Sequence, residues 1–178
     1  MRCSEVLSNH RCLLSGFVLV IMVFTAQCSS PPAQLTEESL QNGEYQGIYP
    51  EPVQLTNGIY EGEPFEQGGA SRPRVIFVEP HAFGDLDGDG VDDAAVLLVE
   101  NSGGSGSFVY LSAVLNQSGE PVNQATTLLG DRVQVEQLTI KSGEILIRML
   151  AHGPDDPQCC PSQEMQSSYT LDGGELID

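Results

Sequence analysis

The sequence predicts a mainly β fold: an antiparallel meander, formed as a curved sheet or a small sandwich, with one short N-terminal helix. Three observations predict it. Short runs of β-branched and apolar residues recur along the chain, and turns rich in Gly and Asn separate them. Between these runs the sequence offers no helix long enough to connect parallel strands, so antiparallel pairing is expected.

The helix is expected to begin at Thr36, whose hydroxyl can cap it. Two glutamates follow directly and favour the positive end of a helix, and Asn42-Gly43 is a suitable end. The next expected element is a hairpin, because residues 53–55 and 59–61 flank the turn sequence Thr56-Asn57-Gly58.

A β-branched run over residues 74–78 predicts a strand that ends at Pro80. The continuous apolar run over residues 94–99 is typical of a strand buried on both faces. An interruption of the apolar alternation near Glu136-Gln137 predicts a bulge. The remaining predicted strands are separated by turn residues and cover residues 108–115, 122–129, 133–140, 144–150, 165–171 and 175–177.

The first residues have the composition of an export signal. Residues 13–25 are uncharged and mostly apolar, which is long enough for a signal-peptide core and too short for a spanning helix. We therefore expect a signal peptide over residues 1–27, a linker over 28–35 and a single β-rich domain over 36–178. Residues 25–28 resemble a bacterial lipobox, which predicts lipidation of Cys28; ordinary cleavage nearby and an uncleaved anchor remain alternatives.

The chain from Cys28 onward is strongly acidic. It carries five Lys and Arg residues against 24 Asp and Glu residues, a formal charge of −19. Binding to phosphate backbones depends on clustered Lys and Arg, so nucleic acid is excluded as an expected partner.

The segment from Asp85 to Asp93 places acidic residues at alternate positions around two glycines, which is the layout of a calcium loop. With Asp85 at position 1, the side chains of Asp87, Asp89 and Asp93 fall at positions 3, 5 and 9, and the Val91 carbonyl falls at position 7. These residues are the predicted Ca²⁺ ligands. An acidic turn that binds nothing is the alternative, although the mutual repulsion of the carboxylates favours a bound cation.

The loop is not an EF-hand, because Val96 stands where the bidentate glutamate would be. Residues 83–96 instead resemble the strand-loop-strand calcium site of FG-GAP repeats. A propeller needs several blades, and this chain holds one copy, so only the loop is implied. His81, just before the loop, is expected to be a surface residue or to support the loop from outside the ligand set.

Cys159 and Cys160 are adjacent in a proline-rich segment. If Cys28 is lipidated and the signal removed, they are each other's only internal partners in an oxidising compartment. A structural vicinal disulfide, buried thiols, a redox pair and a transition-metal site that includes His152 are all open. If Cys28 is not lipidated, it could pair with one of them.

Four segments together resemble an uncharacterised family of exported bacterial lipoproteins: residues 84–99, residues 103–106 with 108–111, residues 129–133 and residues 156–162. The resemblance implies an envelope location and brings no established activity. The expected function is a calcium-stabilised, non-enzymatic envelope lipoprotein. It would be anchored to the membrane through its lipid, on the periplasmic or extracellular side, and would bind an envelope protein or wall component. The alternative is a thiol redox or metal-handling protein that uses Cys159 and Cys160.

Overall fold

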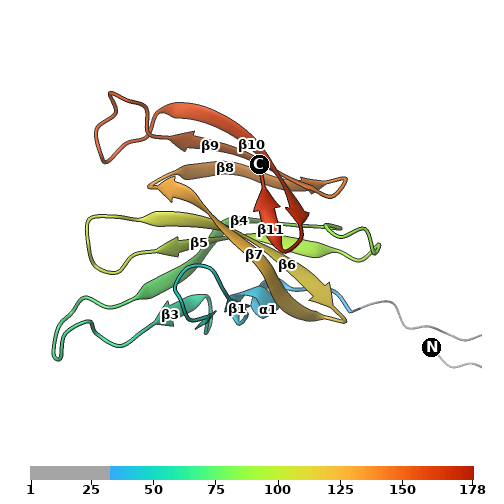
Figure 1. Cartoon of the computed structure of the whole chain (residues 1–178), viewed down its shortest axis with the longest axis horizontal. Coiled ribbons are helices and arrows are strands. Elements are labelled where there is room, and N and C mark those ends of the chain that lie inside the picture. Colours follow the sequence, from blue (N-terminus) through green and yellow to red (C-terminus); the bar gives the residue numbers. More distant parts are fainter. Residues whose placement is uncertain (1–32) are drawn as a thin grey trace, which may run out of the picture. The chain divides into compact units, whose positions relative to one another are not determined.

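Two antiparallel sheets, a two-stranded ribbon and one short helix make up residues 33–178, the part of the chain that the computed structural model describes (Figure 1). The mainly β prediction is confirmed. The expected signal peptide and Cys28 lie outside the described residues. In chain order the elements are α1 (Glu37–Gln41), β1 (Glu44–Tyr45), β2 (Val53–Gln54), β3 (Ile59–Glu61), β4 (Arg74–Gly84), β5 (Asp93–Glu100), β6 (Phe108–Gln117), β7 (Glu120–Asp131), β8 (Gln134–Lys141), β9 (Glu144–Ala151), β10 (Gln163–Asp172) and β11 (Glu175–Ile177).

The larger sheet has the strand order β3-β4-β5-β6-β7, and the smaller sheet has the order β11-β10-β9-β8. The two sheets enclose one apolar core, in which Leu97 and Leu111 of the larger sheet meet Ile145 and Ile147 of the smaller. A second apolar cluster lies on the opposite face of the larger sheet, where α1 and the β1-β2 ribbon cover it. The domain is therefore layered, with the larger sheet in the middle.

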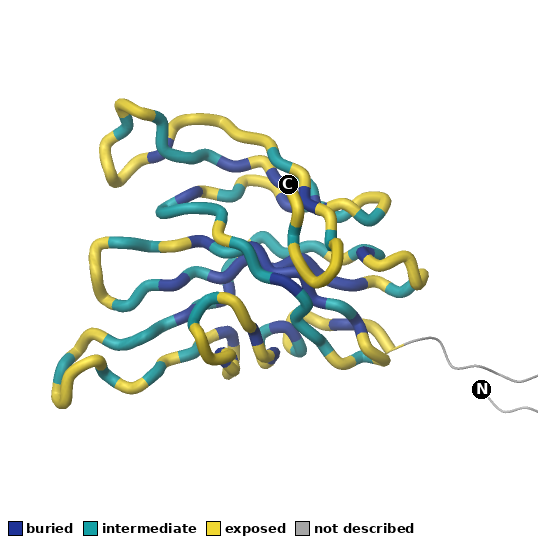
Figure 2. The backbone as a smooth tube through the Cα atoms, viewed as in Figure 1, coloured by how far each residue is buried: buried dark blue, intermediate teal, exposed yellow. Residues whose placement is uncertain are grey.

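Strand β5 lies at the centre of this arrangement. Ala95 and Leu97 belong to the core between the sheets, while Val96 and Leu98 belong to the cluster under α1. Successive side chains of a strand point to opposite faces, so a strand between two apolar layers needs an uninterrupted apolar sequence. The prediction that residues 94–99 are buried on both faces is confirmed, and Figure 2 shows the buried stretch in the middle of the domain.

The predicted helix is present with its predicted cap. The Thr36 hydroxyl accepts a hydrogen bond from the Ser39 amide at 3.1 Å, and the Ser39 hydroxyl accepts one from the Thr36 amide at 3.0 Å. Leu40 is fully buried, and its carbonyl accepts a 2.8 Å hydrogen bond from the buried Tyr45 hydroxyl. These contacts fix α1 against the larger sheet. No helix in the described range 33–178 has the length and apolar character needed to cross a membrane.

The predicted hairpin of residues 53–61 is wrong in its pairing. The turn forms, with positive φ at Asn57 and Gly58 and one bridge between Thr56 and Ile59. However, β2 pairs with β1, and β3 pairs with β4. The reason lies in the tertiary packing. Val53 of β2 is buried beneath the larger sheet, so β2 and β3, the strands on either side of the turn, belong to different sheets.

The prediction that a strand ends at Pro80 is also wrong, because β4 continues to Gly84. Pro80 lies within a register shift between Val78 and Ala82, where its missing N–H interrupts no regular ladder pair. The other predicted strands are present, and the predicted bulge falls between Val135 and Gln137.

Leu35, which the sequence places in the linker, is buried in the cluster under α1. The carbonyl of the nearby Ala33 also accepts a hydrogen bond from the Asn116 amide group at 2.9 Å. The end of the expected linker is thus attached to the domain.

Candidate functional site

The acidic loop connects β4 to β5, and the pairing of Gly84 with Asp93 closes it. Asp85, the first acid of the loop, holds the loop backbone through its carboxylate. Asp85 accepts hydrogen bonds from the Gly88 amide at 2.6 Å and from the Gly90 amide at 3.0 Å. Gly88 and Gly90 have φ values of 83° and 84°, a region that favours glycine over residues with a Cβ. The two glycines therefore let the chain wind tightly around Asp85.

Three carboxylates gather in this loop. One oxygen from each of Asp85, Asp87 and Asp89 lies within 4.8 Å of the others, and the three residues could hold a metal ion. The Asp87 carboxylate accepts a hydrogen bond from the Asp89 amide at 3.1 Å, and the Asp89 carboxylate accepts one from the Val91 amide at 2.7 Å. The loop thus presents three of its predicted ligands together, on an exposed tip. The other two predicted ligands, the Val91 carbonyl and Asp93, lie at its far end.

Asp93 has a different environment from the other acids of the loop. It is 1 % exposed, and its two oxygens each accept a 2.8 Å hydrogen bond, one from the Leu86 amide and one from the Asn116 amide. Burial raises the pKa of its carboxyl above the ordinary value, while the two hydrogen bonds oppose that rise. Asp93 therefore ties the loop to the start of β5 and to the end of β6.

The loop is also held against the smaller sheet. A Cβ added at Gly84 would lie 2.8 Å from Cγ2 of Ile140 in β8, so the absence of a side chain at Gly84 lets β4 approach β8 closely. On the other side, a surface hollow of about 400 Å³ separates Asp87 and Asp89 from the β6-β7 turn at residues 116–118. Asp87 and Asp89 thus border this hollow, while Asp93 attaches the loop to the sheet.

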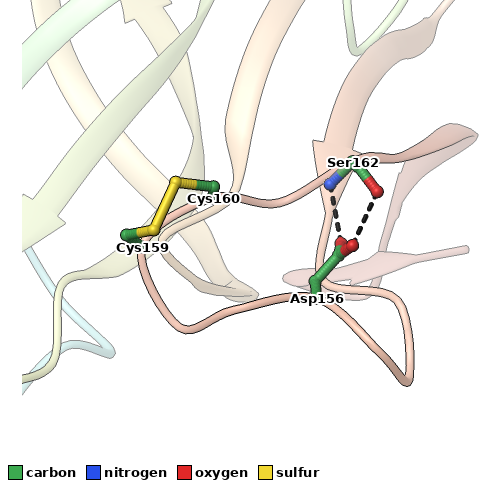
Figure 3. The surroundings of a disulfide bond; sticks show 4 residues. All are labelled: Asp156, Cys159, Cys160 and Ser162. Atoms are coloured by element: carbon green, nitrogen blue, oxygen red, sulfur yellow. Dashed lines mark hydrogen bonds between the residues drawn. A yellow bond between two sulfur atoms is a disulfide. The ribbon is translucent and has the colours of Figure 1, made fainter.

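The paired cysteines lie in the long β9-β10 loop (Figure 3). Cys159 and Cys160 are joined by a disulfide, and both residues are exposed. The structure thus has a vicinal disulfide and no buried thiols at this pair, while the redox role stays a prediction. A bonded sulfur is not a thiolate, so in this state neither cysteine is available to a metal.

Asp156 organises the same loop. Its carboxylate accepts hydrogen bonds from the Ser162 amide and the Ser162 hydroxyl, both at 2.7 Å (Figure 3). It also accepts one from the Gly153 amide at 2.8 Å. Hydrogen bonding to the ionised form lowers the pKa of the Asp156 carboxyl, with the Ser162 hydroxyl as the main contributor. The loop that carries the disulfide is therefore closed by a charged side chain at its base.

One group of chemically capable residues was not found from the sequence. Glu37 of α1 meets Glu79 and His81 of β4, and one possible ligand atom from each lies within 4.8 Å of the others. No local pattern indicates this cluster, because Glu37 precedes Glu79 and His81 by more than 40 residues and only the packing of α1 on the larger sheet brings it to them.

Comparison of the chain with family models, with curated proteins and with solved structures gave no match.

Proposed function

We propose that this protein is a calcium-stabilised, non-enzymatic lipoprotein of the bacterial cell envelope, which binds another envelope protein or a wall component. The gathering of Asp85, Asp87 and Asp89 on the β4-β5 loop is the observation that carries the proposal. Membrane attachment through a lipidated Cys28 would place the acidic domain outside the cytoplasm, where millimolar calcium is common.

Calcium suits this loop because the groups it offers are oxygens. Calcium takes six to eight oxygen ligands at flexible angles, whereas magnesium demands near-ideal octahedral geometry. Three carboxylates and the Val91 carbonyl would supply part of the sphere, and water could complete it from the adjoining hollow. The other predicted ligand, Asp93, is buried and is not among the three carboxylates that lie together, so we assign it to anchoring the loop.

The expected contribution to stability is modest. Extracellular calcium modules have dissociation constants of about 0.1–1 mM. At ten times the dissociation constant, binding to the folded state alone stabilises it by about 1.4 kcal/mol. For a domain of this size that corresponds to about 3–6 °C in the melting temperature. Calcium would thus fix the loop and the start of β5, in a domain that folds without it.

The test is a thermal melt of the full chain in chelator and in calcium. We expect calcium to raise the melting temperature of the wild type and to have no effect on Asp87→Ala or Asp89→Ala. Asp92→Ala is the matched control, since Asp92 is an exposed acid of the same loop outside the cluster and should keep the calcium response. A wild-type melt that calcium leaves unchanged would refute the proposal.

A second candidate function is thiol redox chemistry at the vicinal cysteines, favoured by the exposure of both residues. In this reaction a partner dithiol would attack one sulfur, form a mixed disulfide and then release the two cysteine thiols as it is itself oxidised. Because adjacent Cα atoms are 3.8 Å apart, below the usual disulfide range, ready reduction is expected.

This candidate is tested by incubating the native protein with a graded series of dithiol-disulfide buffers and counting free thiols. Two thiols should appear together while the fold persists. A Cys159→Ser, Cys160→Ser double variant controls for thiols elsewhere in the chain. Sulfurs that stay inert in the folded protein would exclude the redox role.

A further inference from the structure

The cluster of Glu37, Glu79 and His81 differs in kind from the acidic loop, because it combines a ring nitrogen with two carboxylates. Imidazole is a ligand of zinc, copper, iron and nickel, whereas calcium takes oxygen ligands. The residues Glu37, Glu79 and His81 come from α1 and β4. These two elements are held against each other by the buried apolar residues around Leu40 and Phe77. The set is therefore assembled by the fold.

His81 is the best-positioned member. Its side chain is 15 % exposed. Its ring lies between two phenyl rings, with centroid distances of 5.7 Å to Phe77 and 5.3 Å to Phe83, the latter edge-on. These contacts restrict the orientation of the imidazole before any ligand arrives, which reduces the entropy lost on binding.

Glu79 is held against His81 at two points. Its carboxylate accepts a hydrogen bond from the His81 backbone amide at 3.2 Å, and its other oxygen lies 3.0 Å from Nδ1 of the ring. Both residues belong to the register shift in β4, where the chain departs from regular pairing. Bulges of this kind redirect side chains away from the sheet, and here the result is a carboxylate and an imidazole directed at each other.

Glu37 completes the set from the first turn of α1. Its carboxylate accepts a 2.6 Å hydrogen bond from the Gln41 side chain, one turn along the helix. Two carboxylates then face one imidazole. In the described part of the chain, the arginines that pair with acids within 4 Å pair with Glu61, Asp131 and Glu136, not with Glu37 or Glu79. A divalent cation would neutralise the two negative charges that remain.

We propose that Glu37, Glu79 and His81 form a second metal site, selective for a divalent first-row transition metal such as zinc. The ion would take the place of the proton between Nδ1 of His81 and the Glu79 oxygen. Zinc-ligand distances of 2.0–2.2 Å put two tetrahedral ligands about 3.4 Å apart. The observed 3.0 Å separation needs only a small opening, and the exposed Glu37 moves inward by rotating its side chain.

Three protein ligands leave the fourth tetrahedral position to water or to a group from outside. This is the composition of sites that bind an exchangeable ligand, whereas purely structural zinc sites have four protein ligands. The site does not depend on the proposed calcium loop, because it uses different residues and a different donor set.

The test is calorimetric titration of zinc chloride into the full chain at neutral pH, without reductant and with calcium at saturation to occupy the acidic loop. We expect one equivalent of zinc to bind. His81→Asn and Glu79→Gln should each weaken binding at least about tenfold, the lower bound known even for groups that only support a ligand. Cobalt in place of zinc should give visible absorption bands that the His81→Asn variant loses.

Two matched controls keep the result specific. Glu38→Gln alters the next acid of the same helix, and His152→Asn alters a histidine outside the cluster; both should bind zinc as the wild type does. Melting temperatures without metal identify any variant that is merely unfolded. The proposal is overturned if the wild type takes up no zinc, if His81→Asn binds it unchanged, or if uptake depends on Asp87 and Asp89 instead.

Discussion

Replacing Asp93 should destabilise the protein even when no calcium is present. Asp93 is buried, and its carboxylate is the acceptor for two backbone amides, those of Leu86 and Asn116. In Asp93→Ala both buried donors lose their acceptor, and each unsatisfied donor costs about 1–3 kcal/mol. Release of a buried charge returns part of this, because burial raises the pKa of the Asp93 carboxyl and so disfavours its ionised form. The expected net loss is about 2–4 kcal/mol.

Asp93→Asn tests the effect of losing one of the two hydrogen bonds while the other is kept. The asparagine oxygen can still accept from one amide, while its NH₂ group faces the other donor, so we expect about half the loss, or 1–2 kcal/mol. Both variants are to be measured by urea unfolding in chelator, with the midpoint and the slope determined separately.

Asp92→Ala is the matched control. Asp92 is exposed, so the change should stay within about 0.5 kcal/mol. If Asp93→Ala is as stable as Asp92→Ala in chelator and loses only its calcium response, Asp93 acts as a metal ligand and not as an anchor. The reasoning from its two hydrogen bonds would then be refuted.

Two further predictions concern other parts of the domain. The folded-state pKa of Asp156 lies below the ordinary value of 3.8, so its hold on the β9-β10 loop is complete above about pH 4 and is lost as the pH falls through that lowered pKa. The Ser162 amide resonance should therefore titrate with a midpoint below 3.8, and a midpoint above it would contradict the assignment. Gly84→Ala should lower the unfolding free energy by about 1–3 kcal/mol through its clash with Ile140, measured in urea. Gly104→Ala, where an added Cβ meets nothing within 4 Å, should leave it nearly unchanged.

The elements that the sequence predicted correctly are those whose signals are local. Thr36 caps a helix through a residue three positions away, and the bulge near Glu136 follows from a break in alternation within one strand. The apolar run of β5 shows burial on both faces because every side chain meets one of two apolar layers. These features depend on contacts within a few residues or on the simple count of apolar positions.

The predictions that were wrong concern which strands pair with each other and where a strand ends. The Asn57-Gly58 turn formed as expected, yet the strands beside it joined different sheets because Val53 found its burial beneath the larger sheet. Likewise Pro80 did not end β4, since a register shift accommodated it. A turn sequence specifies a reversal of the chain, and it carries no information about which neighbour offers the larger apolar surface.

The sequence by itself determined the β class, the helix cap, the acidic loop and the adjacency of Cys159 and Cys160, because each of these depends on residues that are close together in the sequence. Tertiary structure decided how those groups are used. It buried Asp93 against two amides, left the disulfide exposed, and brought Glu37 to Glu79 and His81. The physical reason is that burial and the meeting of distant side chains depend on how the layers pack, which is a property of the whole chain and not of any one segment.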